Sequence, residues 1–117
     1  MPSEIKDGDD GQIRRYRQYL PLTESMFYVM LSLIEPLHGY GVMQKVEVIS
    51  RGTVTIGPGT LYGMFTSFES EGLFGLVKEE DRRKSYLLTA KGKRVPARQI
   101  ERLDIMVKNA ADVRNRL

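Results

Sequence analysis

Residues 57–72 read GPGTLYGMFTSFESEG and carry the signals of one complete helix. Gly57-Pro58 is a favourable start, because proline at the first helical position loses no intrahelical hydrogen bond. Gly72 is a typical end, because glycine tolerates the left-handed conformation that closes many helices. Helical spacing separates an apolar face from a small and polar one. We expect a buried face of Leu61, Met64 or Phe65, and Phe68, and an outer face of Thr60, Gly63, Thr66, Ser67 and Ser70.

Two further helices are predicted before this one. Thr23 is the expected N-cap of the first, and Pro36 stops it. The corner Leu37–Gly41 has two glycines that tolerate positive φ and leads into the second helix, which Arg51-Gly52 closes. Residues 53–56 are β-branched throughout and predict a short strand. The inward faces are expected to hold Met26, Phe27, Met30, Leu31 and Ile34 in the first helix, and Val42, Met43, Val46 and Ile49 in the second.

The N-terminal end is predicted to differ from the rest. Residues 1–11 are rich in glycine and aspartate and predict a disordered tail. Residues 12–20 space their apolar side chains by three and four, which predicts a short helix ended by Pro21. The sequence assigns no role to its basic residues, Arg14, Arg15 and Arg17.

Two strand-like runs, 73–78 and 84–88, follow Gly72 and predict a hairpin through the charged residues 79–83. Thr89 is expected to cap a helical pattern over 90–117. Pro96 either kinks this helix or marks the start of its long part. The helix has an apolar stripe about 25 Å long, which it cannot bury alone. The stripe consists of Ile100, Leu103, Met106 or Val107, Ala110, Val113 and Leu117.

The order helix, turn, helix, strand, helix and hairpin is that of a winged helix-turn-helix. The expected fold is therefore α+β and mostly helical, a winged helix-turn-helix domain followed by a long C-terminal helix. At 117 residues the chain can close one modest core. It has no cysteine, no apolar run near the roughly 18 residues of a membrane span, and no secretion signal, which fits a cytoplasmic protein.

Charge is segregated along the chain. Residues 1–81 hold 7 basic and 12 acidic side chains, a net charge of −5, whereas residues 82–117 hold 11 basic and 3 acidic, a net charge of +8. Such a basic region attracts a polyanion, although a solvated basic helix would look the same.

Catalysis is not predicted. His38 is the only histidine, and no triad or zinc centre is built from one histidine without partners. The carboxylates of Asp9-Asp10 and of residues 79–81 lie in the tail and at the hairpin tip, where they form no protected acid and base pair. The glycines complete no phosphate or dinucleotide motif. We expect no enzyme, no cofactor and no metal site.

Three features favour DNA as the partner. Thr60 lies near the start of the third helix, where short side chains permit close approach. Tyr62 adds a hydroxyl beside that face, and Arg82-Arg83-Lys84 places three cations on one side of the hairpin. The alternative is an ordinary solvated face.

At these residues the sequence resembles the PadR family of bacterial transcriptional regulators, over roughly residues 22–95. Three blocks in matching order carry the resemblance: Leu37–Gly41, Gly59–Tyr62 with Phe68–Leu73, and Arg82–Gly92. It implies a homodimeric repressor that binds a palindromic operator in double-stranded DNA. Together with the predicted helices, it makes residues 12–89 the expected DNA-binding domain and residues 90–117 the expected dimerisation helix. The DNA-facing residues that it implies are Tyr40, Thr60, Tyr62, Arg82, Arg83 and Lys84.

Several positions depart from the family pattern. Thr66 and Ser67 of the outer face are included in the expected interface. Because relatives often have basic residues at these two positions, we expect salt-sensitive affinity chiefly from residues 82–98. Gly63 loosens the third helix by about 0.8–1 kcal/mol relative to alanine. No tryptophan is present, so the effector pocket that some family members build from paired tryptophans cannot form here. A small hydrophobic or aromatic effector that binds elsewhere is left open. The alternatives are a winged-helix module for protein contacts and a drug-binding dimer with weak DNA affinity.

Overall fold

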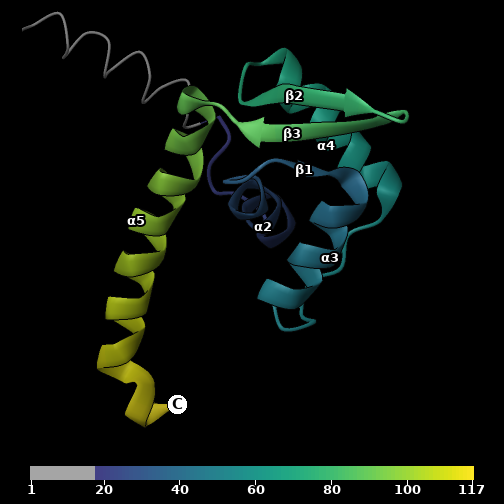
Figure 1. Cartoon of the computed structure of the whole chain (residues 1–117). Helices are drawn as coiled ribbons and strands as arrows, with labels where there is room; N and C mark the ends of the chain where they lie inside the picture. The colour runs from purple at the N-terminus through teal and green to yellow at the C-terminus, as the bar shows by residue number, and fades with distance from the viewer. Residues whose placement is uncertain (1–17) are drawn as a thin grey trace, which may run out of the picture.

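The computed structural model describes residues 18–117, so the predicted tail and most of the predicted helix over 12–20, with its three arginines, lie outside the described residues. Residues 18–20 lead into Pro21 through a turn and are not helical. The helices are α2 (Glu24–Ser32), α3 (Gly39–Ile49), α4 (Pro58–Ser70) and α5 (Ala90–Val113), with a 3-10 turn at Arg114–Arg116; the strands are β1 (Leu37–His38), β2 (Phe74–Glu80) and β3 (Arg83–Leu88) (Figure 1).

Helix α2 begins as predicted and ends earlier than predicted. The Thr23 hydroxyl caps it by accepting from the Met26 N–H at 3.1 Å. The helix ends at Ser32, so Ile34 lies beyond it and is 54% exposed, which corrects its place in the inward stripe. The apolar residues that α2 and its C-cap bury completely are Val29, Met30 and Leu33, while Met26, Phe27 and Leu31 are only partly buried.

The corner before α3 is a strand. Leu37 pairs with Tyr86 and His38 with Ser85, which makes β1 the edge of a three-stranded sheet in the order β1-β3-β2. Gly39 and Gly41 do not have the positive φ that the sequence suggested. Ile49, expected to face inward, is 39% exposed at the end of α3.

The strand predicted over residues 53–56 is absent, which is a second correction. β-Branched residues need a neighbouring strand to form a ladder, and here β1 occupies the sheet edge next to β3. The Ser50 hydroxyl instead holds the segment, because it accepts from the Val54 N–H at 3.1 Å and donates to the Val54 carbonyl at 3.2 Å. Val54 is buried in this loop.

Helix α4 follows the prediction closely. Pro58 is its first residue, and Gly72, with a φ of 76°, follows its C-cap. Leu61, Phe65 and Phe68 are buried. They pack against the sheet, where the Phe65 ring stacks on Tyr86 with centroids 4.4 Å apart, and the other buried positions include Leu73, Phe74 and Leu88.

The hairpin of β2 and β3 is the predicted one, but its strands are longer. Its loop is only Asp81-Arg82, and both residues have positive φ, 51° and 67°. Two successive positive φ values give the turn whose twist matches a β-hairpin. Glu79 and Glu80 therefore lie in β2 and not in the loop.

Helix α5 begins at Ala90 and continues through Pro96, so Pro96 does not mark its start. The Thr89 hydroxyl caps the helix by accepting from the Gly92 N–H at 2.9 Å. Val95 and Pro96 are buried, whereas the helix beyond Gln99 extends away from the other elements (Figure 1). The predicted stripe is therefore largely exposed in one chain, with Met106 and Val107 both 61% exposed. None of the helices within residues 18–117 has the length and hydrophobicity to cross a membrane.

Candidate nucleic-acid interface

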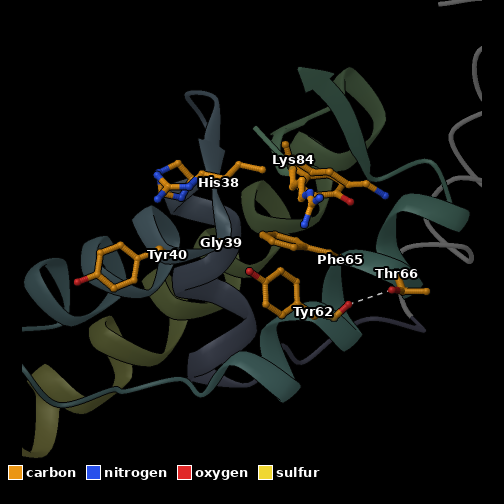
Figure 2. A pocket seen from close by; sticks show the side chains of 10 residues that line it. His38, Gly39, Tyr40, Tyr62, Phe65, Thr66 and Lys84 are labelled. Carbon is orange, nitrogen blue, oxygen red and sulfur yellow. Dashed lines mark hydrogen bonds between the residues drawn. The ribbon is translucent and has the colours of Figure 1, made fainter. Parts of the chain in front are cut away.

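A concave surface lies between the start of α3, helix α4 and the β2–β3 hairpin, which we call the wing (Figure 2). Its cavity volume is about 420 Å³. It brings together six of the eight predicted DNA-facing residues, Tyr40, Tyr62, Thr66, Arg82, Arg83 and Lys84, and it is also lined by His38, Gly39, Phe65 and Tyr86.

His38 has a structural role in this surface. Its Nδ1 accepts a hydrogen bond from the Gly41 N–H at 3.3 Å and so caps α3. Because β1 holds His38 opposite Ser85, the cap also ties the start of α3 to the wing. His38 thereby fixes the start of α3, one residue before Tyr40.

Gly39 gives the Tyr62 side chain room beside the α3 backbone. A Cβ placed on it would lie 2.7 Å from the Tyr62 hydroxyl oxygen, closer than side chains approach. The Tyr62 ring therefore lies directly against the α3 backbone, and its other contact is edge-on to Phe65, with centroids 5.9 Å apart. This contact brings the starts of α3 and α4 together (Figure 2). Tyr62 is still 54% exposed, so its hydroxyl can meet a ligand.

The exposed side of α4 is small and uncharged at its centre. Gly63, Thr66 and Ser67 are exposed there, opposite the buried Leu61 and Phe65. Thr66 donates its hydroxyl to the Tyr62 carbonyl at 3.0 Å, which leaves its oxygen able to accept. Thr60 and Ser67 do not line the cavity. They are exposed on the side of α4 away from the wing, whereas Tyr62 and Thr66 lie on the side that lines the cavity.

The wing supplies the cations. Arg82, Arg83 and Lys84 are exposed, and within residues 18–117 none of them takes part in an ion pair. The acidic side chains opposite them in the register lie on β2, where Glu80 pairs with Lys78 at 2.6 Å. The basic strand of the wing is thus available to an anion.

Tyr86 joins the wing to α4 and was not recognised from the sequence as part of a contact with Glu69. Burial raises the pKa of the Tyr86 hydroxyl, and the neighbouring Glu69 carboxylate on α4 adds to the effect. The hydroxyl therefore stays protonated at neutral pH. No sequence signal marks this pair, because the two residues are distant in the chain and meet only in the fold.

A polar helix face beside a cationic hairpin is common to many nucleic-acid-binding proteins, so sequence comparison decides the family. Residues 29–98 match the transcriptional regulator PadR-like family. The chain belongs to the PadR-like family. The resemblance inferred from the three sequence blocks is confirmed, and so is the winged-helix fold with its C-terminal helix. PadR-like proteins are DNA-binding transcriptional regulators.

Individual proteins are similar to this chain in sequence or in fold. The PadR-like chain is 30% identical over 77 residues, 65% of its length, to an uncharacterized 37.1 kDa protein in transposon TN4556 of Streptomyces fradiae, of which it spans 22%. Its fold is similar to a transcriptional regulator from Clostridium thermocellum, with a TM-score of 0.62 and 20% identity over 82% of this chain and 90% of that one. It is also similar to a PadR family transcriptional regulator from Eggerthella lenta, with a TM-score of 0.59 and 20% identity over 95% of both chains.

Proposed function

We propose that this PadR-like chain is a homodimeric repressor that binds a palindromic operator, with α4 in the major groove and the wing on the phosphate backbone. The observation that carries the proposal is the concave surface on which an uncharged face of α4 meets three exposed cations of the wing. In winged-helix proteins these two elements approach the groove and the backbone respectively. We call α4 the recognition helix from here on.

Small residues on the recognition helix support its entry into the groove. Gly63 projects no side chain, and Thr66 and Ser67 are short, so the helix backbone can come close to the base edges. Hydroxyl groups such as that of Thr60 can donate to or accept from several bases. We assign base contacts to Thr60 and Ser67 and phosphate contacts to Tyr40, Tyr62 and the wing.

Helix α5 is the proposed dimerisation element, over residues 90–117, and residues 12–89 are the proposed DNA-binding domain. Its exposed apolar stripe supports this division, because apolar surface of this extent is normally covered by a partner. A two-fold dimer would present two recognition helices to half-sites one turn of DNA apart, about 34 Å.

Release by a small apolar effector is the last part of the proposal. An apolar groove of about 310 Å³ between α2 and α5 supports it. A ligand bound in this groove would contact the dimerisation helix directly. The groove is lined mainly by aliphatic side chains, those of Met30, Leu31, Ile34, Leu88, Pro96, Ala97 and Ile100, with Lys93 beside them.

Selection from a random-sequence duplex pool tests the proposal and requires no operator sequence at the start. We expect enrichment of two inverted half-sites whose centres are roughly 10 base pairs apart. The affinity for the selected duplex should fall steeply with salt, because phosphate contacts release counterions. A chain that enriches no sequence, shows no salt dependence, or stays monomeric by mass contradicts the proposal. Enrichment without loss of transcription from a promoter overlapping the site contradicts only the repressor part.

A further inference from the structure

The end of the recognition helix is bonded directly to the start of α5. The Thr89 hydroxyl lies 2.6 Å from the Gly72 carbonyl and 3.1 Å from that of Leu73, and the Thr89 N–H donates to the Leu73 carbonyl at 3.0 Å. The Lys91 ammonium donates to the Glu71 carbonyl at 2.8 Å. A cation at this position also interacts favourably with the negative end of the helix dipole.

Gly92 brings the two backbones into contact. A Cβ at this residue would lie 1.9 Å from the Leu73 carbonyl oxygen, so no other residue fits without displacing the chain. The first turn of α5 therefore packs on the backbone that leaves α4, with no side chain between them. Contacts between backbones leave less freedom than contacts through flexible side chains.

The end of α4 is itself well fixed. The Leu73 N–H donates to the Phe68 carbonyl at 2.8 Å, and the Gly72 N–H donates to the Glu69 carbonyl at 3.0 Å. These two hydrogen bonds are those of a Schellman motif. The carbonyl groups that meet α5 are thus continuous with the recognition helix. A displacement of the first turn of α5 would be passed to α4.

A second attachment fixes the direction of α5. The buried Gln99 side chain accepts from the Leu22 N–H at 3.0 Å, just before α2. Beyond Gln99 the helix extends away from the other elements (Figure 1). Its path from the body of the chain is therefore set within its first ten residues.

We propose that Thr89, Lys91 and Gly92 form a joint through which the direction of α5 sets the orientation of the recognition helix. The three are positioning residues for DNA recognition, and this role rests on the proposed function. In a dimer paired through α5, the joint sets the separation of the two recognition helices. It also carries any change in the pairing of α5 to the DNA-binding surface.

Distance measurement between two spin labels tests the joint without DNA. The chain has no cysteine, so Ser67→Cys on α4 gives one label in each subunit. A rotation at the joint would displace Ser67 on α4 relative to the paired α5 helices. Lys91→Met keeps the aliphatic stem but cannot donate, and we expect it to broaden the distance distribution.

Two matched variants complete the experiment. Lys91→Arg keeps a cationic donor and should restore a narrow distribution. Lys93→Met removes the same charge from the same turn but from outside the joint, and should leave the distribution as in the parent. A distribution equally narrow in Lys91→Met and the parent, with folding confirmed by circular dichroism, overturns the joint. A parent that is monomeric by mass overturns the proposed dimer and with it the role of the joint.

DNA spacing gives a second readout that a purely structural role would not move. Full sites are built from the selected half-site with the spacing changed by one base pair in either direction. The parent should prefer one spacing, and Lys91→Met should lose that preference, whereas Lys93→Met, which removes the same charge, should keep it. Retention of the parental preference by Lys91→Met overturns the proposal.

Discussion

The recognition helix and the wing lie side by side but have opposite chemistry. Helix α4 has no lysine or arginine, and its one charged residue is Glu69. The wing exposes Arg82, Arg83 and Lys84 in succession. The difference suggests a division in which one element distinguishes bases and the other holds the backbone, because only cations neutralise phosphates and only groups in the groove contact base edges.

Such a division works only if the two elements are held at a fixed relative position. Phe65 and Tyr86 provide this by stacking at 4.4 Å between the buried sides of α4 and β3. Glu69 and Tyr86 add a polar contact at the edge of the stack. Substitutions on α4, on the wing, and at the contact between them therefore test this division separately.

Removal of the wing cations should have the largest effect. The triple variant Arg82→Ala/Arg83→Ala/Lys84→Ala loses three charge-assisted contacts, at about 1.5 kcal/mol each, or roughly a thousandfold in affinity per half-site. All sequences should weaken alike, and the slope of log affinity against log salt should fall by about 2.7 per subunit. Fluorescence anisotropy over a salt series measures both.

The control for the wing removes three cations elsewhere. Lys108 in the second half of α5 and Arg114 and Arg116 in the 3-10 turn after it are exposed, and their triple alanine variant, which keeps the apolar stripe, should leave the salt slope nearly unchanged. A wing variant that keeps the parental slope would show that the backbone is held by another region.

Thr60→Ala should have a smaller effect of a different kind. Loss of one neutral hydrogen bond costs about 1 kcal/mol, or roughly fivefold, and only on sequences that offer the matching base. The measurement is the ratio of affinities for the selected half-site and for single-base variants of it. Ser70→Ala, near the end of the same helix, is the control and should keep the ratio. A uniform loss over all sequences would place Thr60 on a phosphate.

Much of this fold follows from local signals in the sequence. The Thr23 and Thr89 caps, the Pro58 start of α4 and the hairpin were predicted because each depends on neighbouring residues. Errors arose where distant residues decide the structure. Residues 53–56 have strand propensity, but β1 takes the sheet edge beside β3 through the pairs of Leu37 and His38. Ile34 has helical spacing, but α2 ends before it.

The features of the site also divide into those that local sequence marks and those that only the packing of distant residues sets. Residue type and order were enough to single out Tyr62 and the basic wing, and the cavity brings them together. Gly39 was noticed because glycine tolerates positive φ, but it does not have positive φ, and the Tyr62 ring lies against it instead. The contacts of Lys91 with Glu71 and of Glu69 with Tyr86 depend on packing between elements, which spacing along the chain does not encode.

Gly63→Ala separates stability from recognition. No atom outside its own helix lies within 4 Å of a Cβ at this position, so the change should stabilise α4 by about 0.8–1 kcal/mol, or roughly 4 °C in Tm. The added methyl group lies on the face proposed to approach DNA, so affinity should fall although stability rises. Ser25→Ala in α2 is a control that gains helix propensity away from the interface. Higher affinity for Gly63→Ala would exclude close approach at this point.

Removal of the Tyr86 hydroxyl, which joins the wing to α4, should change the free energy of unfolding least at neutral pH and more at high pH. Burial, together with Glu69, raises the pKa of Tyr86 in the folded chain, so the folded state holds this proton more tightly than the unfolded state. The resulting stability is fully present below the unfolded pKa, about 10, and is lost as pH rises through the folded pKa. Chemical denaturation between pH 8 and roughly 11 should thus show that the free energy of unfolding falls with pH, with a slope that Tyr86→Phe reduces.

Tyr40→Phe removes an exposed hydroxyl outside the contact and should keep the parental slope. Equal slopes in all three proteins would contradict the coupling of the wing to α4 through Tyr86, because the folded chain would then hold the Tyr86 proton no more tightly than the unfolded chain does.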